Sequence, residues 1–260
     1  MSGDDTIDVA RLLAQCQLAA VEYHTSLDST QVRAAALAAT ATRGPTLVVA
    51  DRQTAGRGRG ANRWWTGPGS LAFSLLFAPS DWGLAGGVNP ARSLAAGVAV
   101  AAAVRPALYP HHVGLHWPND VFVAHRKLAG ILIDVLADGR HVLGVGLNVN
   151  NGFASAPAEV RARGTSMIDL TGRSHDRTGI LVNVLNELAA VLTRSAADPA
   201  QLGIEFQELC LQTGEILEIV AGGRNIVGRC LGIAPDGALL IESEGEVRQL
   251  YSGVIQHKHQ

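Results

Sequence analysis

The spacing of apolar and polar positions predicts that helices and strands alternate through most of this chain. Helical spacing predicts helices over residues 7–20, 89–108, 176–194 and 199–211, and N-cap residues at 28–30 predict another that ends near residue 41. Short apolar runs predict strands over residues 21–27, 46–52 and 70–78. Polar turns separate four more runs, which predict adjacent antiparallel strands over residues 113–117, 120–124, 127–136 and 141–150.

The pattern changes near residue 212. The remaining apolar runs are short, at residues 215–220, 225–231, 238–242 and 246–250, and glycine-containing turns lie between them. We therefore expect an α+β domain with a mixed, largely antiparallel sheet over residues 1–211. A small β-barrel-like domain is expected over residues 212–260.

Composition limits the classes of protein to which this chain can belong. Of its 260 residues, 47% are hydrophobic and 17% charged, which excludes an intrinsically disordered chain. The formal net charge is −2, so no overall positive charge points to nucleic acid or to a membrane surface as a partner. The longest Ala/Val-rich stretch, residues 93–104, is too short for the roughly 20 residues that a membrane span takes.

The cysteines and the N-terminal residues indicate a cytoplasmic protein. Cys16, Cys210 and Cys230 are odd in number and far apart, which does not fit a disulfide scaffold or a Cys-based zinc site. Residues 1–8 contain three aspartates and no basic residue, so they do not form a signal peptide.

Residues 53–69, called here the Gly/Arg loop, combine glycines, arginines and two tryptophans. Glycines at 56, 58 and 60 let the backbone approach a ligand, and the arginines between them can bind a carboxylate or phosphate. Trp64 and Trp65 offer flat faces for a purine or an apolar ligand. The loop therefore predicts a site for a small anionic ligand. A solvated loop or a short nucleic-acid-binding segment is the alternative.

A lysine lies close to a tight turn in the next region of interest. Of the 21 basic residues, 19 are arginine, and the two lysines are Lys127 and Lys258, the second in a tail expected to be solvated. The turn at Pro118 is followed by Asp120, and Lys127 opens the next predicted strand. A hairpin would therefore bring a carboxylate and an ammonium to one end of the sheet, beside the uncovered backbone of Gly130. A hairpin without a function fits the same residues.

Five segments in order resemble the signature of biotin protein ligases, over about residues 20–152. They are residues 27–30, the Gly/Arg loop up to Trp64, residues 117–120, residues 127–132, and the Gly-x-Gly-x-Asn run that ends at Asn148. The last run alone fits core packing equally well. The resemblance implies a catalytic domain like that of class II synthetases, followed by a C-terminal SH3-like barrel. It also implies the ligase-only type, without an N-terminal DNA-binding domain.

The resemblance implies a reaction in two steps. Biotin and Mg·ATP would give biotinyl-5′-AMP and pyrophosphate, and the biotinyl group would then pass to one lysine of a biotin carboxyl carrier domain. Mg²⁺ would accompany ATP, and the ligands of the metal stay unknown. A homodimer is compatible with this family, whereas nucleic acid and membrane are not expected as partners.

The resemblance also assigns roles to individual residues. Lys127, Arg57, Arg59 and Asp120 would be catalytic, with Lys127 between the biotin carboxylate and the α-phosphate and Asp120 facing the acceptor amine. A compact ammonium suits that place better than a wide guanidinium. The residues that would bind biotin are Ser29, Thr30, Gln31, Gln53, Arg57, Gly58, Arg59, Lys127 and Gly130. Those that would bind ATP or the adenylate are Arg59, Trp64, Asn119 and Asn148.

Three departures from the family pattern accompany this resemblance. His116 stands where the family usually has lysine, residues 60–62 shorten the usual run of arginines, and Gln31 replaces asparagine. A neutral imidazole would offer less charge to ATP phosphates. The alternatives are a lipoate or octanoate ligase or transferase, and a biotin-binding protein without catalytic activity.

Overall fold

The computed structural model describes residues 5–40 and 43–256, and in this part of the chain seven strands form one sheet. The strands are β1 (Ala20–His24), β2 (Thr46–Ala50), β3 (Leu71–Phe77), β4 (Val113–His116), β5 (Asp120–Val123), β6 (Arg126–Val135) and β7 (His141–Leu147). Their order is β1-β2-β3-β7-β6-β5-β4, with β1 and β2 parallel and every other neighbouring pair antiparallel. The predicted mixed, largely antiparallel sheet is confirmed.

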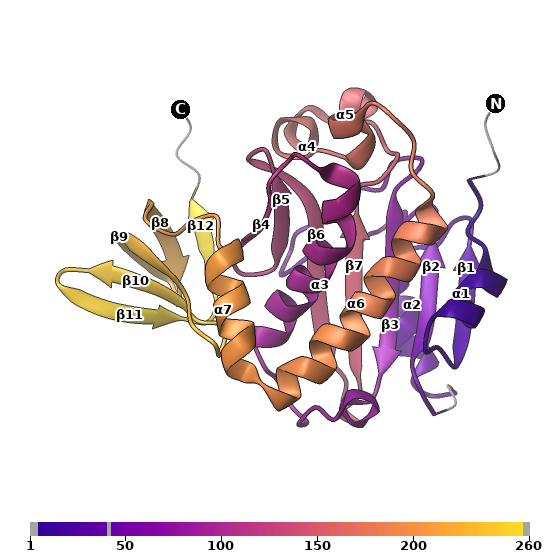
Figure 1. Cartoon of the computed structure of the whole chain (residues 1–260), viewed down its shortest axis with the longest axis horizontal. Coiled ribbons are helices and arrows are strands. Elements are labelled where there is room, and N and C mark those ends of the chain that lie inside the picture. Colours follow the sequence, from indigo (N-terminus) through magenta and orange to yellow (C-terminus); the bar gives the residue numbers. More distant parts are fainter. Residues whose placement is uncertain (1–4, 41–42, 257–260) are drawn as a thin grey trace.

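Helices cover the two faces of this sheet unequally. The long helices α3 (Ala91–Leu108) and α6 (Arg177–Ala197) pack against each other, and α3 lies on β4, β5 and β6 (Figure 1). The shorter α2 (Thr30–Leu37) packs on β2, β3 and β7. Val48 belongs to the apolar cluster of α2, whereas its neighbours Leu47 and Val49 belong to the main core with α3 and α6. Because successive strand residues point to opposite faces, α2 lies on the face opposite α3 and α6.

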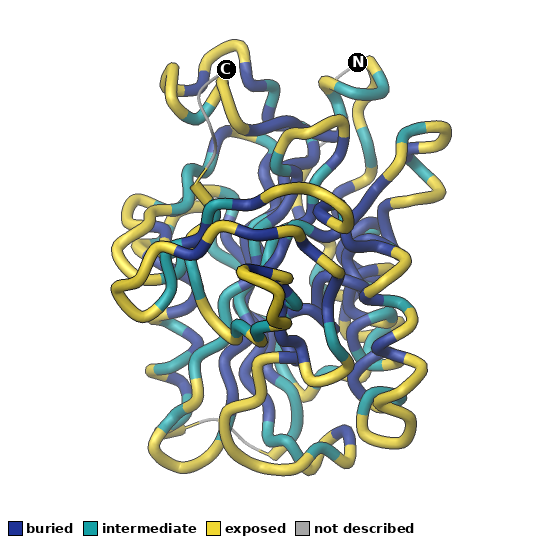
Figure 2. The backbone as a smooth tube through the Cα atoms, turned by 90° about the vertical axis from the view of Figure 1, so that its left-hand side faces the viewer, coloured by how far each residue is buried: buried dark blue, intermediate teal, exposed yellow. Residues whose placement is uncertain are grey.

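A second sheet follows the last helix, α7 (Pro199–Leu209). It contains β8 (Ile216–Ala221), β9 (Arg224–Ile233), β10 (Leu239–Ser243), β11 (Glu246–Leu250) and β12 (Val254–Gln256), in the antiparallel order β11-β10-β9-β8-β12. In Figure 2 the C-terminal sheet faces the viewer, with exposed residues (yellow) mostly on the outer turns and buried residues (dark blue) mostly toward the interior. The predicted all-β C-terminal domain is confirmed, and β12 was not predicted.

Trp117 attaches the C-terminal sheet to the larger domain. This fully buried residue donates from its indole Nε1 to the Gly237 carbonyl at 3.1 Å and from its backbone to Gln212 Oε1 at 2.8 Å. Leu211 donates its backbone N–H to the Leu115 carbonyl at 3.0 Å. Hydrogen bonds therefore connect β4 and the residue after it to the segment that leads into the second sheet and to a turn of that sheet.

The N-terminal elements are shorter than predicted. Helix α1 (Val9–Gln15) begins where the Asp8 side chain accepts the Arg11 N–H, and it ends where Cys16 adopts an extended conformation. The Ala19 N–H then donates to the Pro45 carbonyl at 2.8 Å, which starts the parallel pairing of β1 with β2. The second predicted helix, α2, ends at Leu37 and not near residue 41, because residues 38–40 form a turn. The tail with Lys258 lies outside the described residues.

Four short helical segments were missed by the sequence analysis. They are the 3₁₀ turns η1 (Pro79–Trp82) and η2 (Phe153–Ser155) and the helices α4 (Ala158–Arg163) and α5 (Met167–Thr171). Each has too few turns to show a helical period in the sequence.

The apolar stretch over residues 93–104, expected to be too short for a membrane span, lies within the longer helix α3. Among the described residues, α3 and α6 are both long and apolar enough to cross a membrane by length and composition. Most of α3 is buried between the sheet and α6, which is the usual place of an apolar helix in a protein core.

Candidate active site

The Gly/Arg loop connects β2 to β3 and folds back on itself. The backbones of Arg57 and Arg63 form an antiparallel β-bridge. The Gly58 N–H donates to the Asn62 carbonyl at 2.8 Å, and the Trp64 N–H donates to the Gly56 carbonyl at 3.0 Å. A Cβ atom on Gly56 would lie 2.5 Å from the Trp64 carbonyl oxygen. Glycine at this position therefore permits a close approach between the two arms of the loop, whereas the sequence analysis expected a close approach to a ligand.

Two glycines, called here the glycine floor, leave the sheet without side chains beneath this loop. Gly130 of β6 and Gly146 of β7 are directly paired across the two strands. A Cβ on Gly146 would lie 2.2 Å from Trp64 Cε2, and one on Gly130 would lie 3.2 Å from Trp64 Cζ3. The Trp64 indole therefore lies against the uncovered backbone that the sequence analysis reserved for a ligand. Its Nε1 is buried and has no hydrogen-bond partner among the described residues.

Lys127 and Asp120 form an ion pair at the edge of the glycine floor. Their Nζ and Oδ1 atoms are 2.7 Å apart, as the predicted hairpin required, and Lys127 Nζ lies 5.7 Å from the centroid of the Trp64 ring. Asp120 pairs with Gly130 across the strands, and a register shift between Val121 and Phe122 brings Lys127 opposite Phe122. The ammonium therefore lies beside a carboxylate, a flat ring and open backbone.

Arg59 joins this group from the Gly/Arg loop. Its Nη2 donates to the Gly253 carbonyl at 2.5 Å, in the turn before β12 of the C-terminal sheet. Burial lowers the pKa of the Arg59 guanidinium from its ordinary value, and the negative charge of Asp120 opposes that shift. Asp120 therefore acts on two cations, Lys127 by direct contact and Arg59 through its field.

Arg57 points to a different partner. Its Nη1 lies 3.3 Å from Asp134 Oδ2, and about half of its side chain is exposed. The structure thus separates the two arginines that the resemblance placed together: Arg59 is close to Asp120, and Arg57 is linked to Asp134. Gly58 lies between them, and its backbone N–H is used within the loop.

A second polar group surrounds the start of α2. Gln53 Oε1 accepts from the Thr30 backbone N–H at 2.9 Å and from Thr30 Oγ1 at 3.2 Å. Ser74, a polar residue within an apolar strand, donates from Oγ to Thr30 Oγ1 at 2.9 Å. Ser29 Oγ is buried without a partner in the described part of the chain. An unpaired buried hydroxyl is costly unless a ligand or water satisfies it, so Ser29 fits a ligand-binding role.

Gln31 is satisfied within the protein. Its Nε2 donates to the Val142 carbonyl at 3.0 Å and to Asp134 Oδ2 at 3.1 Å, and its Oε1 accepts from Ser74 Oγ at 3.1 Å. This buried amide therefore connects α2 to β3, β6 and β7. Its biotin-binding role stays a prediction.

The two asparagines expected near the nucleotide contact the backbone of β6, one in its middle and one at its start. Asn119 donates from Nδ2 to the Ile131 carbonyl, and Asn148 lies with Nδ2 3.5 Å from the Lys127 carbonyl. Asn148 Oδ1 also accepts from Asn151 Nδ2 at 2.9 Å. Both side chains therefore fix the backbone that carries Lys127 and Gly130, and their contact with a nucleotide stays a prediction.

His116 lies in the same group of residues. It pairs with Asp120 across β4 and β5, and its ring stacks on Phe122 with centroids 4.5 Å apart. Its position therefore agrees with the resemblance, while a contact with ATP phosphates stays a prediction.

Several residues of the site were missed by sequence reasoning. Ser74 and Asp134 each interrupt an apolar strand, a signal that could have identified them. Gly253 carries no comparable signal, because it contacts Arg59 through its backbone carbonyl and lies 194 residues after Arg59 in the sequence.

Positive side chains beside a strip of sheet without side chains are the arrangement expected of an enzyme that binds a small anionic substrate. A sequence model of the Biotin/lipoate A/B protein ligase family matches residues 23–150. A model of the Biotin protein ligase C terminal domain matches residues 209–258.

Individual biotin ligases are similar to this chain over most of its length. The chain is 35% identical over 220 residues to the biotin–[acetyl-CoA-carboxylase] ligase of Mycobacterium tuberculosis, covering 81% of this chain and 78% of that one. It is 31% identical over 242 residues to the bifunctional ligase/repressor BirA of Bacillus subtilis, covering 90% and 73%. The biotin protein ligase of Aquifex aeolicus in complex with biotin and ATP superposes with a TM-score of 0.80 at 29% identity, covering 92% and 98%. This chain belongs to the biotin protein ligase family.

The contact between Trp64 and the glycine floor generates a prediction. In Gly146→Ala, the new methyl group excludes the indole from its place, since the Cβ would lie 2.2 Å from Cε2. Amide hydrogen exchange of residues 56–66 should become faster in the ligand-free protein. Gly86→Ala is the matched control, because a Cβ at Gly86 meets no atom within 4 Å. Equal exchange in both variants would contradict the contact.

Proposed function

We propose that this chain activates biotin with ATP to biotinyl-5′-AMP and transfers the biotinyl group to a lysine of a biotin carboxyl carrier domain. The observation that carries the proposal is the Lys127–Asp120 pair beside the glycine floor, in a chain that belongs to the biotin protein ligase family. The solved relative from Aquifex aeolicus binds biotin and ATP, which supports these two molecules as substrates.

In the first step, the biotin carboxylate attacks the α-phosphorus and pyrophosphate leaves. Two anions must meet, so the site needs fixed positive charge around the reacting atoms. Lys127 supplies it when its ammonium exchanges the Asp120 carboxylate for substrate oxygens. Arg59 is close enough to Asp120 to feel its charge and would stabilise the same phosphate. The resemblance also gives Arg57 a place near the biotin carboxylate, which requires Arg57 to leave Asp134.

In the second step, the acceptor amine attacks the acyl carbon and AMP leaves. The amine must lose a proton, and a carboxylate within reach can accept it. Asp120 is released for this role once Lys127 binds the substrate anions. The ion pair of the ligand-free protein thus divides into two catalytic groups.

The remaining roles follow the two polar groups of the site. Ser29, Thr30 and Gln53, with Gln31 behind them, would bind biotin at the start of α2, and Gly58 and Gly130 would line that site. Trp64 would leave the glycine floor and cover the adenine, while Asn119 and Asn148 would hold the nucleotide side of the site.

Magnesium would enter with ATP as part of the substrate. Among the described residues, no group of three or more His, Cys, Asp or Glu side chains could hold a metal ion. We therefore propose that Mg²⁺ is bound mainly by the phosphate oxygens of ATP and by water.

The proposal also covers the domain boundary, the location and the partners of this protein. We place the domain boundary after residue 211, where the hydrogen bond from Leu211 to β4 ends the larger domain. Three free cysteines and a formal net charge of −2 support a cytoplasmic enzyme without nucleic acid or membrane as a partner. A homodimer is compatible with this proposal.

An exchange assay tests the function directly. With biotin as the acid, the protein should exchange labelled pyrophosphate into ATP, and a carrier domain added afterwards should become biotinylated. Exchange that depends on lipoate or octanoate instead would assign the chain to that reaction. Biotin binding without exchange would leave a binding protein.

The role of Lys127 predicts a loss in the first step. Lys127→Ala should lower the rate of pyrophosphate exchange by about 10² or more, the usual scale for removing one charge-stabilising contact. Lys127→Arg should also be slow, because the planar guanidinium cannot replace a compact ammonium. Near-normal exchange in both variants would exclude Lys127 from catalysis.

Asp120 is expected to affect the second step more strongly. In Asp120→Asn, transfer from preformed biotinyl-5′-AMP to the carrier domain should fall by about 10² or more, since the proton acceptor is lost. Pyrophosphate exchange should fall much less. Equal losses in the two assays would contradict a role specific to transfer.

A further inference from the structure

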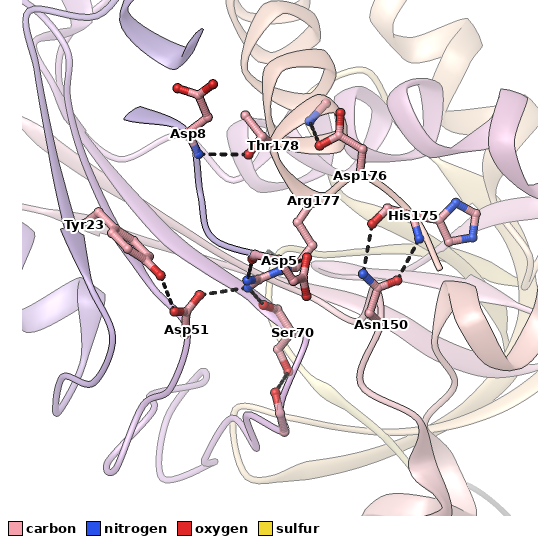
Figure 3. A network of polar contacts seen from close by, with 12 residues as sticks. Asp5, Asp8, Tyr23, Asp51, Ser70, Asn150, His175, Asp176, Arg177 and Thr178 are labelled. Carbon is pink, nitrogen blue, oxygen red and sulfur yellow. Dashed lines mark hydrogen bonds and ion pairs between the residues drawn. The ribbon is translucent and has the colours of Figure 1, made fainter. Parts of the chain in front are cut away.

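Both ends of the Gly/Arg loop are held by one buried arginine that the resemblance does not include. Arg177 is the first residue of α6, and its side chain is 5% exposed. Its Nη1 donates to Asp51 Oδ1, directly after β2, at 2.9 Å. The same Nη1 donates to the Ser70 carbonyl, directly before β3, at 2.9 Å (Figure 3). One guanidinium therefore connects the two points where the loop leaves and re-enters the sheet.

The other side of this guanidinium binds the N-terminal segment. Arg177 Nε lies 2.9 Å from Asp5 Oδ1, and Nη2 donates to the Asp5 carbonyl. Tyr23 donates its hydroxyl to the second oxygen of Asp51. Burial lowers the pKa of Arg177, but the hydrogen bonds that it donates to Asp5 and Asp51 outweigh that effect and raise the pKa. The guanidinium therefore stays charged and binds three separate segments, which its rigid fork of five donors allows.

A second set of contacts, from the residues just before α6, reaches the end of the loop that precedes β3. His175 and Asn150 exchange two hydrogen bonds of 2.9 Å (Figure 3). The Asn150 backbone N–H donates to the Gly69 carbonyl at 2.9 Å. Gly69 has φ +84°, and a Cβ there would lie 2.7 Å from Asn150 Cβ. The residues before β3 are thus fixed from two sides.

We propose that Arg177 is a positioning residue for the ligand: it fixes both ends of the Gly/Arg loop so that Gln53 and Trp64 reach the ligand face of the sheet together. The ladder between β2 and β3 ends at Ala50 paired with Ala72. Beyond it, Asp51 donates its backbone N–H to the His24 carbonyl of β1 at 3.0 Å, and the Arg177 side chain joins Asp51 to Ser70. Gln53 follows Asp51 by two residues and binds Thr30. The proposal rests on the proposed function, since it takes this loop as the one that closes on biotin and ATP.

Arg92 provides a matched control. It is also a buried arginine, 4% exposed, and it donates from Nη1 to the Gly87 carbonyl at 2.7 Å and from Nη2 to the Ala85 carbonyl. It also contacts the ring of His141 in β7, with Nη1 3.0 Å from Nε2, so its contacts hold residues 85–87 and His141, outside the Gly/Arg loop. Arg177→Lys and Arg92→Lys therefore both replace a buried fork by an ammonium, and only the first releases the loop.

Hydrogen exchange of the ligand-free protein is the first measurement. In Arg177→Lys, amides of residues 53–69 should exchange about tenfold faster than in the parent, while those of β6 and β7 stay unchanged. Arg92→Lys should leave residues 53–69 as in the parent. Equal exchange of this loop in both lysine variants would overturn the proposal.

Kinetics of pyrophosphate exchange are the second measurement. Arg177→Lys should raise KM for biotin about tenfold and change kcat by less than about threefold, because Arg177 touches no reacting atom. A general loss of folded protein would instead lower the apparent kcat with KM unchanged, which would overturn the positioning role.

Asp51→Asn keeps the proposal testable if Arg177→Lys does not fold. The amide retains an oxygen for Arg177 without the charge, so a smaller change of the same kind is expected, and parent-like exchange of the loop would overturn the proposal. If the parent shows no biotin-dependent exchange, the proposed function fails, and the hydrogen-exchange comparison still decides whether Arg177 holds the loop.

Discussion

The site depends on two missing side chains. Gly130 and Gly146 face each other across β6 and β7, so the sheet offers bare backbone at one place. A larger residue at Gly146 would project a carbon into the Trp64 ring, at 2.2 Å from Cε2. Trp64 can pack here and Lys127 can lie over its ring because the floor is flat. The floor therefore determines where an aromatic ring or a ligand can lie.

The charges around this floor are neutralised by the protein in a way that substrates can reverse. Lys127 pairs with Asp120, and Arg57 pairs with Asp134; all four side chains are partly exposed. The Arg57–Asp134 pair is the more exposed of the two, and such a pair contributes only about 0–1 kcal/mol, so exchanging Asp134 for a substrate anion costs little. Arg59 differs, since it is more buried and binds a backbone carbonyl. Arg57 must therefore leave Asp134 to reach a ligand, whereas Arg59 would act on the phosphate from its place beside the C-terminal sheet.

The sequence predicted the parts of this structure that have a period or a local motif. The strands from β4 to β7 show alternating or apolar runs with clear turns, and the Lys127–Asp120 pair follows from one hairpin. Contacts between distant segments leave no such pattern: Arg59 with Gly253 and Arg177 with Asp51 could not be predicted. Gln31 illustrates the same limit, because only the fold reveals that Ser74 and Val142 satisfy its amide.

The Gly/Arg loop is the segment on which these separate contacts converge. Trp64 attaches it to the glycine floor, Arg59 attaches it to the C-terminal sheet, and Arg177 attaches its ends to α6. The contact at the ends is buried and charge-assisted, whereas Trp64 buries an indole N–H without a partner among the described residues, an arrangement that costs about 1–3 kcal/mol. Ligand binding that gives this N–H an acceptor or returns it to water therefore removes the cost of the unpaired donor, while the ends of the loop stay fixed. Fixed ends and a replaceable central contact are what a loop needs if it is to exchange its own ring for a substrate without losing its register on the sheet.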